Sequence, residues 1–265
     1  MRGALVSSNL AKSRPSGSLA VHKGGSEDTS SNNEADKIAE KATRSSPCTN
    51  ADPRVRAAIH QFTQDAYGHY QQGAPNLGHL RILLQVNVNI AFDYNSKTLG
   101  MSLAHHDYDA ISPFNKQGPL LGKNYSSEAH NWPESLQPTT LQFSKEHHPW
   151  IDLFPFPRLR DNILMAIEEP GVCDEDELCH DLCHYSGDKG SRAGLVVWGE
   201  ASNPYNWELS TEFLEKWGYL LYACPELLEA TNHWRARRNE KTISTRAFAE
   251  AIVRTDPRVL QLCRN

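Results

Sequence analysis

The side chains of this chain that could do chemistry are cysteines and histidines with nearby acids, and they form two clusters. The first is Cys179-His180-x-x-Cys183-His184. On a helix, Cys179 and Cys183 lie one turn apart on one face, and the two histidines lie on the adjoining face. Two or three of these groups could bind zinc. However, the usual two-residue cysteine spacer and a distant second ligand pair are absent, and cysteines beside leucines are typical of a core. We therefore expect core cysteines and no metal or other cofactor.

The second cluster begins at His147-His148. His147 with Asp152, or His148 with Asp161, could perform acid–base chemistry if a pocket forms around them. Histidines beside an aromatic, proline-rich segment more often pack and hydrogen-bond. The pair in His105-His106-Asp107 is a poor ligand signal, because neighbouring histidines point in different directions. The catalytic candidates are thus His147, His148 and Asp152, and the sequence favours a non-enzymatic role over an enzymatic one.

The elements that must position these groups are organised around residues 147–164, HHPWIDLFPFPRLRDNIL. Its three prolines exclude a helix before Phe156, because each fixes φ and restricts the preceding residue. After Pro157, apolar residues recur every fourth position, which predicts an amphipathic helix that ends by Pro170. We expect an extended, aromatic-rich first part that is buried, with the later helices closed over it.

Apolar periodicity and capping residues predict the remaining elements. The helix over 77–99 is apolar on more than one side, so it should be central. Its Asn87, Asn89 and Asn95 should satisfy backbone or partner groups inside a bundle. Residues 101–146 look irregular. The other predicted elements are helices over 53–70 and 245–254, a helix from Asp174, a helix capped by Ser210, a helix from Pro225, a short strand over 194–199 and a turn over 203–207.

These patterns predict a mainly α protein: a single helical-bundle-like domain over 53–265, with long irregular loops and at most a short strand. Hydrophobic residues make up 39% of the chain, and the mean hydropathy is −0.58. The apolar deficit lies in residues 1–52, which lack Phe, Trp and Tyr and are rich in Ser, Asn and Gly. Such a segment cannot bury enough apolar surface to offset its ordering entropy, so we expect a disordered tail.

Charge and cysteine content limit the possible partners. The net charge of −5 and pI near 6.2 argue against a dominant nucleic-acid surface. No apolar run approaches the ~18 residues of a membrane span, so we expect no membrane partner. The six cysteines occur without a secretory signal, which favours reduced thiols inside the cell.

Several long stretches together carry a family likeness. They are LRILLQVNVNIAFDYNSKTLG (80–100), DYDAISPF (107–114), the segment 136–164, DELCHDLC (176–183) and the segment 194–241. With them, the sequence resembles a fungal domain of unknown function that typically lies C-terminal to the basic leucine zipper of transcription factors. Members of that group that act as transcription factors carry a basic region and a leucine heptad repeat. Here residues 1–52 hold seven Lys and Arg against six Asp and Glu, and no leucine heptad follows.

The resemblance implies a fungal transcription regulator that lacks its own basic region and is tied to a secondary-metabolite gene cluster. It implies a nuclear location, with the cytoplasm as the alternative. Protein partners are expected, bZIP-type regulators among them, with DNA contacted only weakly or indirectly. Two alternatives stay open: an enzyme of secondary metabolism that uses the His and Asp groups of the HHPWID segment, and an interaction module that does not bind DNA but titrates zipper-bearing partners.

Overall fold

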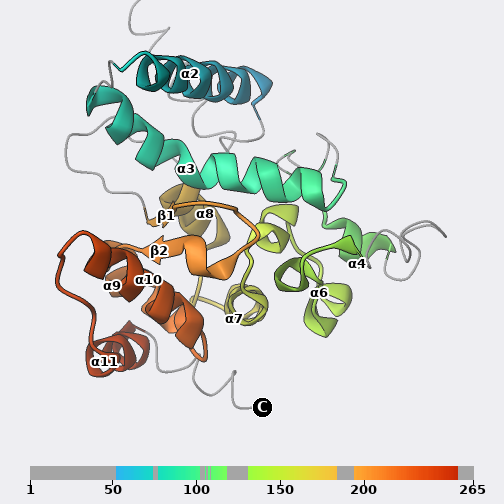
Figure 1. Ribbon diagram of the computed structural model, residues 1–265. Coiled ribbons are helices and arrows are strands. Elements are labelled where there is room, and N and C mark those ends of the chain that lie inside the picture. Colours follow the sequence, from blue (N-terminus) through green and yellow to red (C-terminus); the bar gives the residue numbers. More distant parts are fainter. Residues whose placement is uncertain are drawn as a thin grey trace, which may run out of the picture. The chain divides into compact units, whose positions relative to one another are not determined.

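Helices dominate the part of the chain that the structure describes (Figure 1). This computed structural model describes residues 52–73, 77–101, 105, 107, 109–117, 131–183 and 194–255. Within these ranges the only sheet has two short strands, which confirms the predicted mainly α class. The described residues all belong to one compact unit, Thr43–Asn265. The tail expected over 1–52 lies outside the described residues, apart from Asp52.

Helices α2, Pro53–Gln71, and α3, Leu77–Thr98, come first along the chain and agree with the predicted ranges. Asp52 begins α2, where its Oδ1 accepts a hydrogen bond from the Arg54 amide at 2.8 Å. Gly100 ends α3 with a φ of 70°, a left-handed conformation that glycine adopts without strain. Helix α3 lies against β1, α8 and η5, so its apolar residues are covered on more than one side (Figure 1). None of the described helices has the length and apolar content needed to cross a membrane.

The central segment folds as a 3-10 helix, η5, Pro149–Leu153, followed by α7, Pro157–Glu168. The prediction of an extended first part was therefore wrong, while α7 matches the predicted helix. Proline excludes an α-helix here, but a single tight turn tolerates it at the first position. The apolar residues of this segment are buried, as predicted: Trp150, Ile151, Leu153, Phe154, Phe156, Leu159, Ile163 and Leu164.

The small sheet pairs β1, Leu195–Val197, antiparallel with β2, Trp207–Leu209, so that Leu195 lies opposite Leu209. Strand β1 was predicted. Strand β2 was not, because three residues are too few to establish the two-residue period of a strand, and they follow directly on the expected turn. Trp207 fills the centre of the core, with ring centroids 6.0 Å from Phe154 and 6.1 Å from Phe156. The expected turn is the 3-10 helix η6, Pro204–Asn206.

Helices of the C-terminal part close the core on the other side, as expected. Helix α9, Thr211–Trp217, is capped by Ser210 and continues into the 3-10 helix η7, Gly218–Leu221. Helix α10, Pro225–Arg237, packs against β2 and η6. The last helix, α11, Thr245–Thr255, packs against η7 and α9.

Short helices occupy the described parts of the region that looked irregular. They are α4, Pro113–Gln117, the 3-10 helix η4, Glu134–Leu136, and α6, Thr140–Ser144. Helix α8, Glu175–Cys183, follows α7 and begins where the Asp174 carboxylate accepts from the Glu177 amide at 3.0 Å. Helix α6 packs against α4 and α7.

The asparagine amides of α3 bind distant backbone groups, as predicted. Asn87 makes two hydrogen bonds with the backbone of Val197. Asn89 donates to the Cys183 carbonyl at 2.8 Å. Asn95 donates to the carbonyls of Leu153, at 2.8 Å, and Ala201, at 3.2 Å. These amides tie α3 to β1, α8 and η5.

Candidate functional site

Asp152 lies at the centre of a buried hydrogen-bond network formed by Ser112, Gln142, His147 and Asp152, which we call the Asp152 network. Its Oδ1 accepts from His147 Nε2 at 2.8 Å and from Gln142 Nε2 at 2.5 Å. Its Oδ2 accepts from Ser112 Oγ at 2.6 Å. Asp152 has no exposed surface. The structure thus brings together two of the predicted catalytic residues, His147 and Asp152, in a place that solvent does not reach.

Local structure fixes the two network residues that the sequence analysis did not select. Gln142 belongs to a capping box at the start of α6, where its Oε1 accepts from the Thr139 amide at 2.9 Å. That bond leaves the Gln142 amide nitrogen directed at Asp152. Ser112 lies just before α4, and its amide donates to the His147 carbonyl at 2.7 Å. The Thr-x-x-Gln pattern at 139–142 is a readable capping-box signal and could have identified Gln142.

Both ring nitrogens of His147 face acceptors. Nδ1 lies 2.7 Å from the Lys145 carbonyl, and Nε2 faces the Asp152 carboxylate. Burial opposes the charged form, but the hydrogen bond and charge of Asp152, together with the Lys145 carbonyl, outweigh it and raise the pKa of His147. Since a carbonyl faces one nitrogen and a carboxylate the other, the geometry favours a ring that donates from both, an imidazolium paired with Asp152. Neither nitrogen has a free lone pair to accept a proton from a substrate.

The second predicted pair, His148 with Asp161, is not formed, which corrects the sequence interpretation. His148 Nε2 lies 2.8 Å from the Asp107 carbonyl, and its Nδ1 accepts from the Trp150 amide at 3.3 Å. Asp161 instead accepts from Thr139 Oγ1 at 2.5 Å. The tight η5 turn holds His148 at its own N-terminus, while α7 directs Asp161 toward α6. Burial lowers the pKa of His148, in keeping with a neutral ring.

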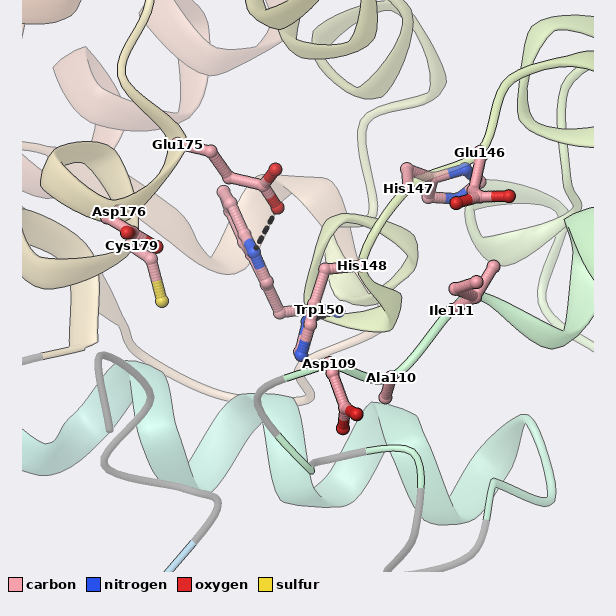
Figure 2. Close-up of a pocket in the computed structure, with 10 residues that line it drawn as sticks. All are labelled: Asp109, Ala110, Ile111, Glu146, His147, His148, Trp150, Glu175, Asp176 and Cys179. Atoms are coloured by element: carbon pink, nitrogen blue, oxygen red, sulfur yellow. Dashed lines mark hydrogen bonds between the residues drawn. The ribbon is translucent and has the colours of Figure 1, made fainter. Parts of the chain in front are cut away.

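A pocket of about 320 Å³ lies beside the network (Figure 2). Trp150 donates from its indole nitrogen to Glu175 at 3.2 Å (Figure 2). Burial raises the pKa of Glu175, although the Trp150 hydrogen bond acts in the opposite direction. Four acidic residues give the pocket negative character, which suits a ligand with a positive charge or hydrogen-bond donors. The lining residues are Asp109, Ala110, Ile111, Glu146, His147, His148, Trp150, Glu175, Asp176 and Cys179.

The cysteines and the histidine considered for zinc lie on different sides of helix α8. Cys179 and Cys183 are buried in the core with the leucines of α8. His180 is on the exposed side of the helix, with Nδ1 3.7 Å from Asp181. His184 lies outside the described residues, as does His106 of the His105-His106 pair. Among the described residues, no three His, Cys, Asp or Glu side chains are grouped so as to hold a metal ion.

Arg160 is a buried structural residue that the sequence analysis did not select. It has no exposed surface, and its guanidinium donates to the carbonyls of Ser135, Gln137 and Phe154 at 2.6–2.9 Å. Burial lowers the pKa of Arg160 to about 10. The side chain thus fastens the η4 region to the end of η5. Arg160 lies four residues before Leu164, so the two side chains share one face of α7. Because Leu164 is apolar, this spacing is the signal in the sequence that could have predicted a buried Arg160.

The comparisons with known proteins concern the same segment. Residues 122–228 match the model of a family described as "Domain of unknown function (DUF3425)". No curated protein and no solved structure matches the chain. The matched segment contains Gln142, His147, Asp152 and Arg160, so it includes most of the Asp152 network and the buried arginine. In this chain, these four residues make buried hydrogen bonds that connect separate segments of the fold.

Proposed function

We propose that this protein is a fungal regulator of transcription that lacks a basic region of its own and acts in the nucleus through protein contacts. The observation that carries the proposal is the match of residues 122–228 to a domain of unknown function, taken with the longer likeness to the domain that accompanies basic leucine zippers. A partner would supply the contacts to DNA, since the net charge of −5 disfavours attraction to phosphates. Its targets would belong to a secondary-metabolite gene cluster.

The geometry of the candidate catalytic residues supports a regulatory role over an enzymatic one. His147 donates from both ring nitrogens, and Asp152 accepts from three side chains without reaching solvent. A general base needs a free lone pair within reach of the substrate. His147 lines the pocket but has no free lone pair, and Asp152 does not reach solvent, so neither residue meets both requirements.

The alternative is an enzyme of secondary metabolism, and the pocket beside the network is the observation in its favour. Glu175 lines that pocket with a raised pKa, a property that recurs at functional sites as well as in structural ones. Under this alternative, Glu175→Gln would abolish formation of a metabolite in cells without changing any transcript level.

The deciding experiment is deletion of the gene, followed by transcript and metabolite profiling. We expect a coordinated loss of transcripts from neighbouring biosynthetic genes, restored by the wild-type gene and by the Glu175→Gln variant. Unchanged transcripts together with accumulation of one precursor would replace the regulator with an enzyme. A titration of purified protein with duplex DNA at ~0.15 M salt should show only weak binding without sequence preference, whereas specific binding near 10⁻⁸ M, roughly the range of specific binders, would contradict a partner-dependent regulator.

A further inference from the structure

Aromatic and arginine side chains gather on the surface where β1, η6 and the end of α10 meet. We call this group, Trp198, Tyr205, Trp234, Arg237 and Arg238, the aromatic–arginine surface. Tyr205 is 58% exposed and Trp198 is 36% exposed. Exposed large apolar groups that cluster, unlike scattered ones, indicate an interaction site.

The surface is held in one arrangement by contacts among its own members. The rings of Trp198 and Trp234 stack with centroids 5.4 Å apart and an interplanar angle of 24°. Arg238 lies over Trp198 at 5.0 Å, and Arg237 lies over Trp234 at 5.5 Å. The indole nitrogen of Trp234 donates to the Tyr205 carbonyl at 2.9 Å. A surface already fixed in this way loses little conformational entropy when a partner binds.

The two arginines differ in their charge partners. Arg238 donates to both carboxylate oxygens of Glu208, at 2.8 and 2.6 Å, and also pairs with Glu240. The hydrogen bonds with Glu208 raise the pKa of Arg238 above its ordinary value. Arg237 is exposed, and no carboxylate among the described residues pairs with it. Arg237 therefore presents open N–H donors in the planar geometry that matches a carboxylate.

These features select the chemistry of the partner. Tryptophan, tyrosine and arginine are the residue types that contribute most at protein interfaces. Here they place beside apolar rings a guanidinium that no carboxylate of the described residues pairs with, on a chain whose net charge is negative. Resting on the proposed function, we infer that this surface binds an acidic segment of a protein partner, one that alternates carboxylates with aromatic or large aliphatic side chains. A carboxylate of that segment pairs with Arg237, and its apolar side chains contact Tyr205 and Trp198.

The test uses the full-length protein and fluorescence anisotropy with defined probes. The main probe is a labelled peptide of about ten residues that alternates Glu or Asp with Phe or Leu, the arrangement expected of acidic motifs. One control peptide carries Gln and Asn in place of the acids, and the other carries Ala in place of the apolar residues. Saturable binding of the main probe alone is expected. Failure to bind, or equal binding of the three peptides, would overturn the inference.

Matched variants locate the binding. Arg237→Ala should weaken binding about tenfold, equivalent to about 1.4 kcal/mol. The control Arg246→Ala removes another exposed arginine, one of α11 that pairs with Glu250, and it should leave the affinity unchanged. Likewise Tyr205→Ala should weaken binding, while Tyr67→Ala, at 60% exposure, should not. Equal losses in the two members of either pair would show that the peptide binds elsewhere.

Two further experiments distinguish this inference from the alternatives. A single-stranded oligonucleotide that binds more tightly than the acidic peptide, and loses affinity on Arg237→Ala, would assign the surface to nucleic acid instead. Complementation of the gene deletion by Arg237→Ala should fail to restore the transcripts, with Arg246→Ala as the control. Full restoration by Arg237→Ala overturns this inference alone, whereas an unchanged transcript profile in the deletion strain overturns the proposed function.

Discussion

The Asp152 network and the aromatic–arginine surface both hold their side chains in fixed positions through mutual contacts, but to different ends. In the network, each carboxylate oxygen and each imidazole nitrogen is hydrogen-bonded, and solvent is excluded. On the surface, rings stack and Arg238 is paired, but no carboxylate in the described part of the chain pairs with Arg237. Removing one partner of a buried ion pair is costly, because it leaves an uncompensated charge in the core. A fixed but unsatisfied group at the surface is available to a partner, so the two regions divide folding and recognition between them.

The largest expected effect is the loss of a buried ring. Trp150→Ala should destabilise the fold by ~3–5 kcal/mol, because it leaves a cavity in the core. Trp150 is 3% exposed, and its ring lies 5.8 Å from that of Phe154. Urea denaturation measures the free energy of unfolding. By the same measurement the surface variant Trp198→Ala should lose only ~1 kcal/mol. Equal losses in the two variants would remove the distinction between the regions.

The next effect tests the central carboxylate. Asp152→Asn should cost ~3 kcal/mol, since it leaves the buried His147 imidazolium without its counter-charge. The control is Asp93→Asn, where the pair with Lys97 is exposed and is worth ~0.5 kcal/mol or less. Chemical denaturation of both variants measures the difference. A cost for Asp152→Asn as small as that of the control would mean that His147 is neutral in the fold.

A smaller effect is expected where the shape of a cation matters more than its charge. Arg160→Lys should lose ~2 kcal/mol, because an ammonium cannot reach the carbonyls that the guanidinium spans. Arg237→Lys, at the surface, should change the free energy of unfolding by less than ~0.5 kcal/mol. Thermal unfolding of the two variants would compare them. Full stability of Arg160→Lys would show that the three carbonyls do not depend on a planar donor.

The smallest effect is a pH dependence. The pKa of His147 is raised in the fold, so its stabilising contribution is complete below the unfolded value of about 6.5. The contribution is lost as the pH rises through the raised pKa of the folded state. The free-energy difference between wild type and His147→Gln should therefore shrink as the pH rises above about 6.5. A difference that grows over this range would contradict the ion pair.

Local signals in the sequence predicted much of the helical framework, because prolines, caps and four-residue spacing act over short distances. They also indicated that the asparagines of α3 bind inside the bundle, and that His147 and Asp152 could meet. Contacts between distant segments were beyond such signals. Ser112 reaches Asp152 across 40 residues, and Trp198 meets Trp234 only because β1 and α10 are packed around β2. The arginines at the end of α10 suit a helix C-terminus, so their position gave no sign of an aromatic surface.

The amides of α3 also set an order of events during synthesis. Asn87 binds Val197, 110 residues later, and Asn89 binds Cys183, 94 residues later. At the usual speed of translation, α3 leaves the ribosome about 5–20 s before β1 does. For that interval a helix that is apolar on more than one side lacks the segments that cover it. The nascent chain must therefore wait for the 3-10 helix η5, α8 and β1, and the native position of α3 is established only once most of the chain has been made.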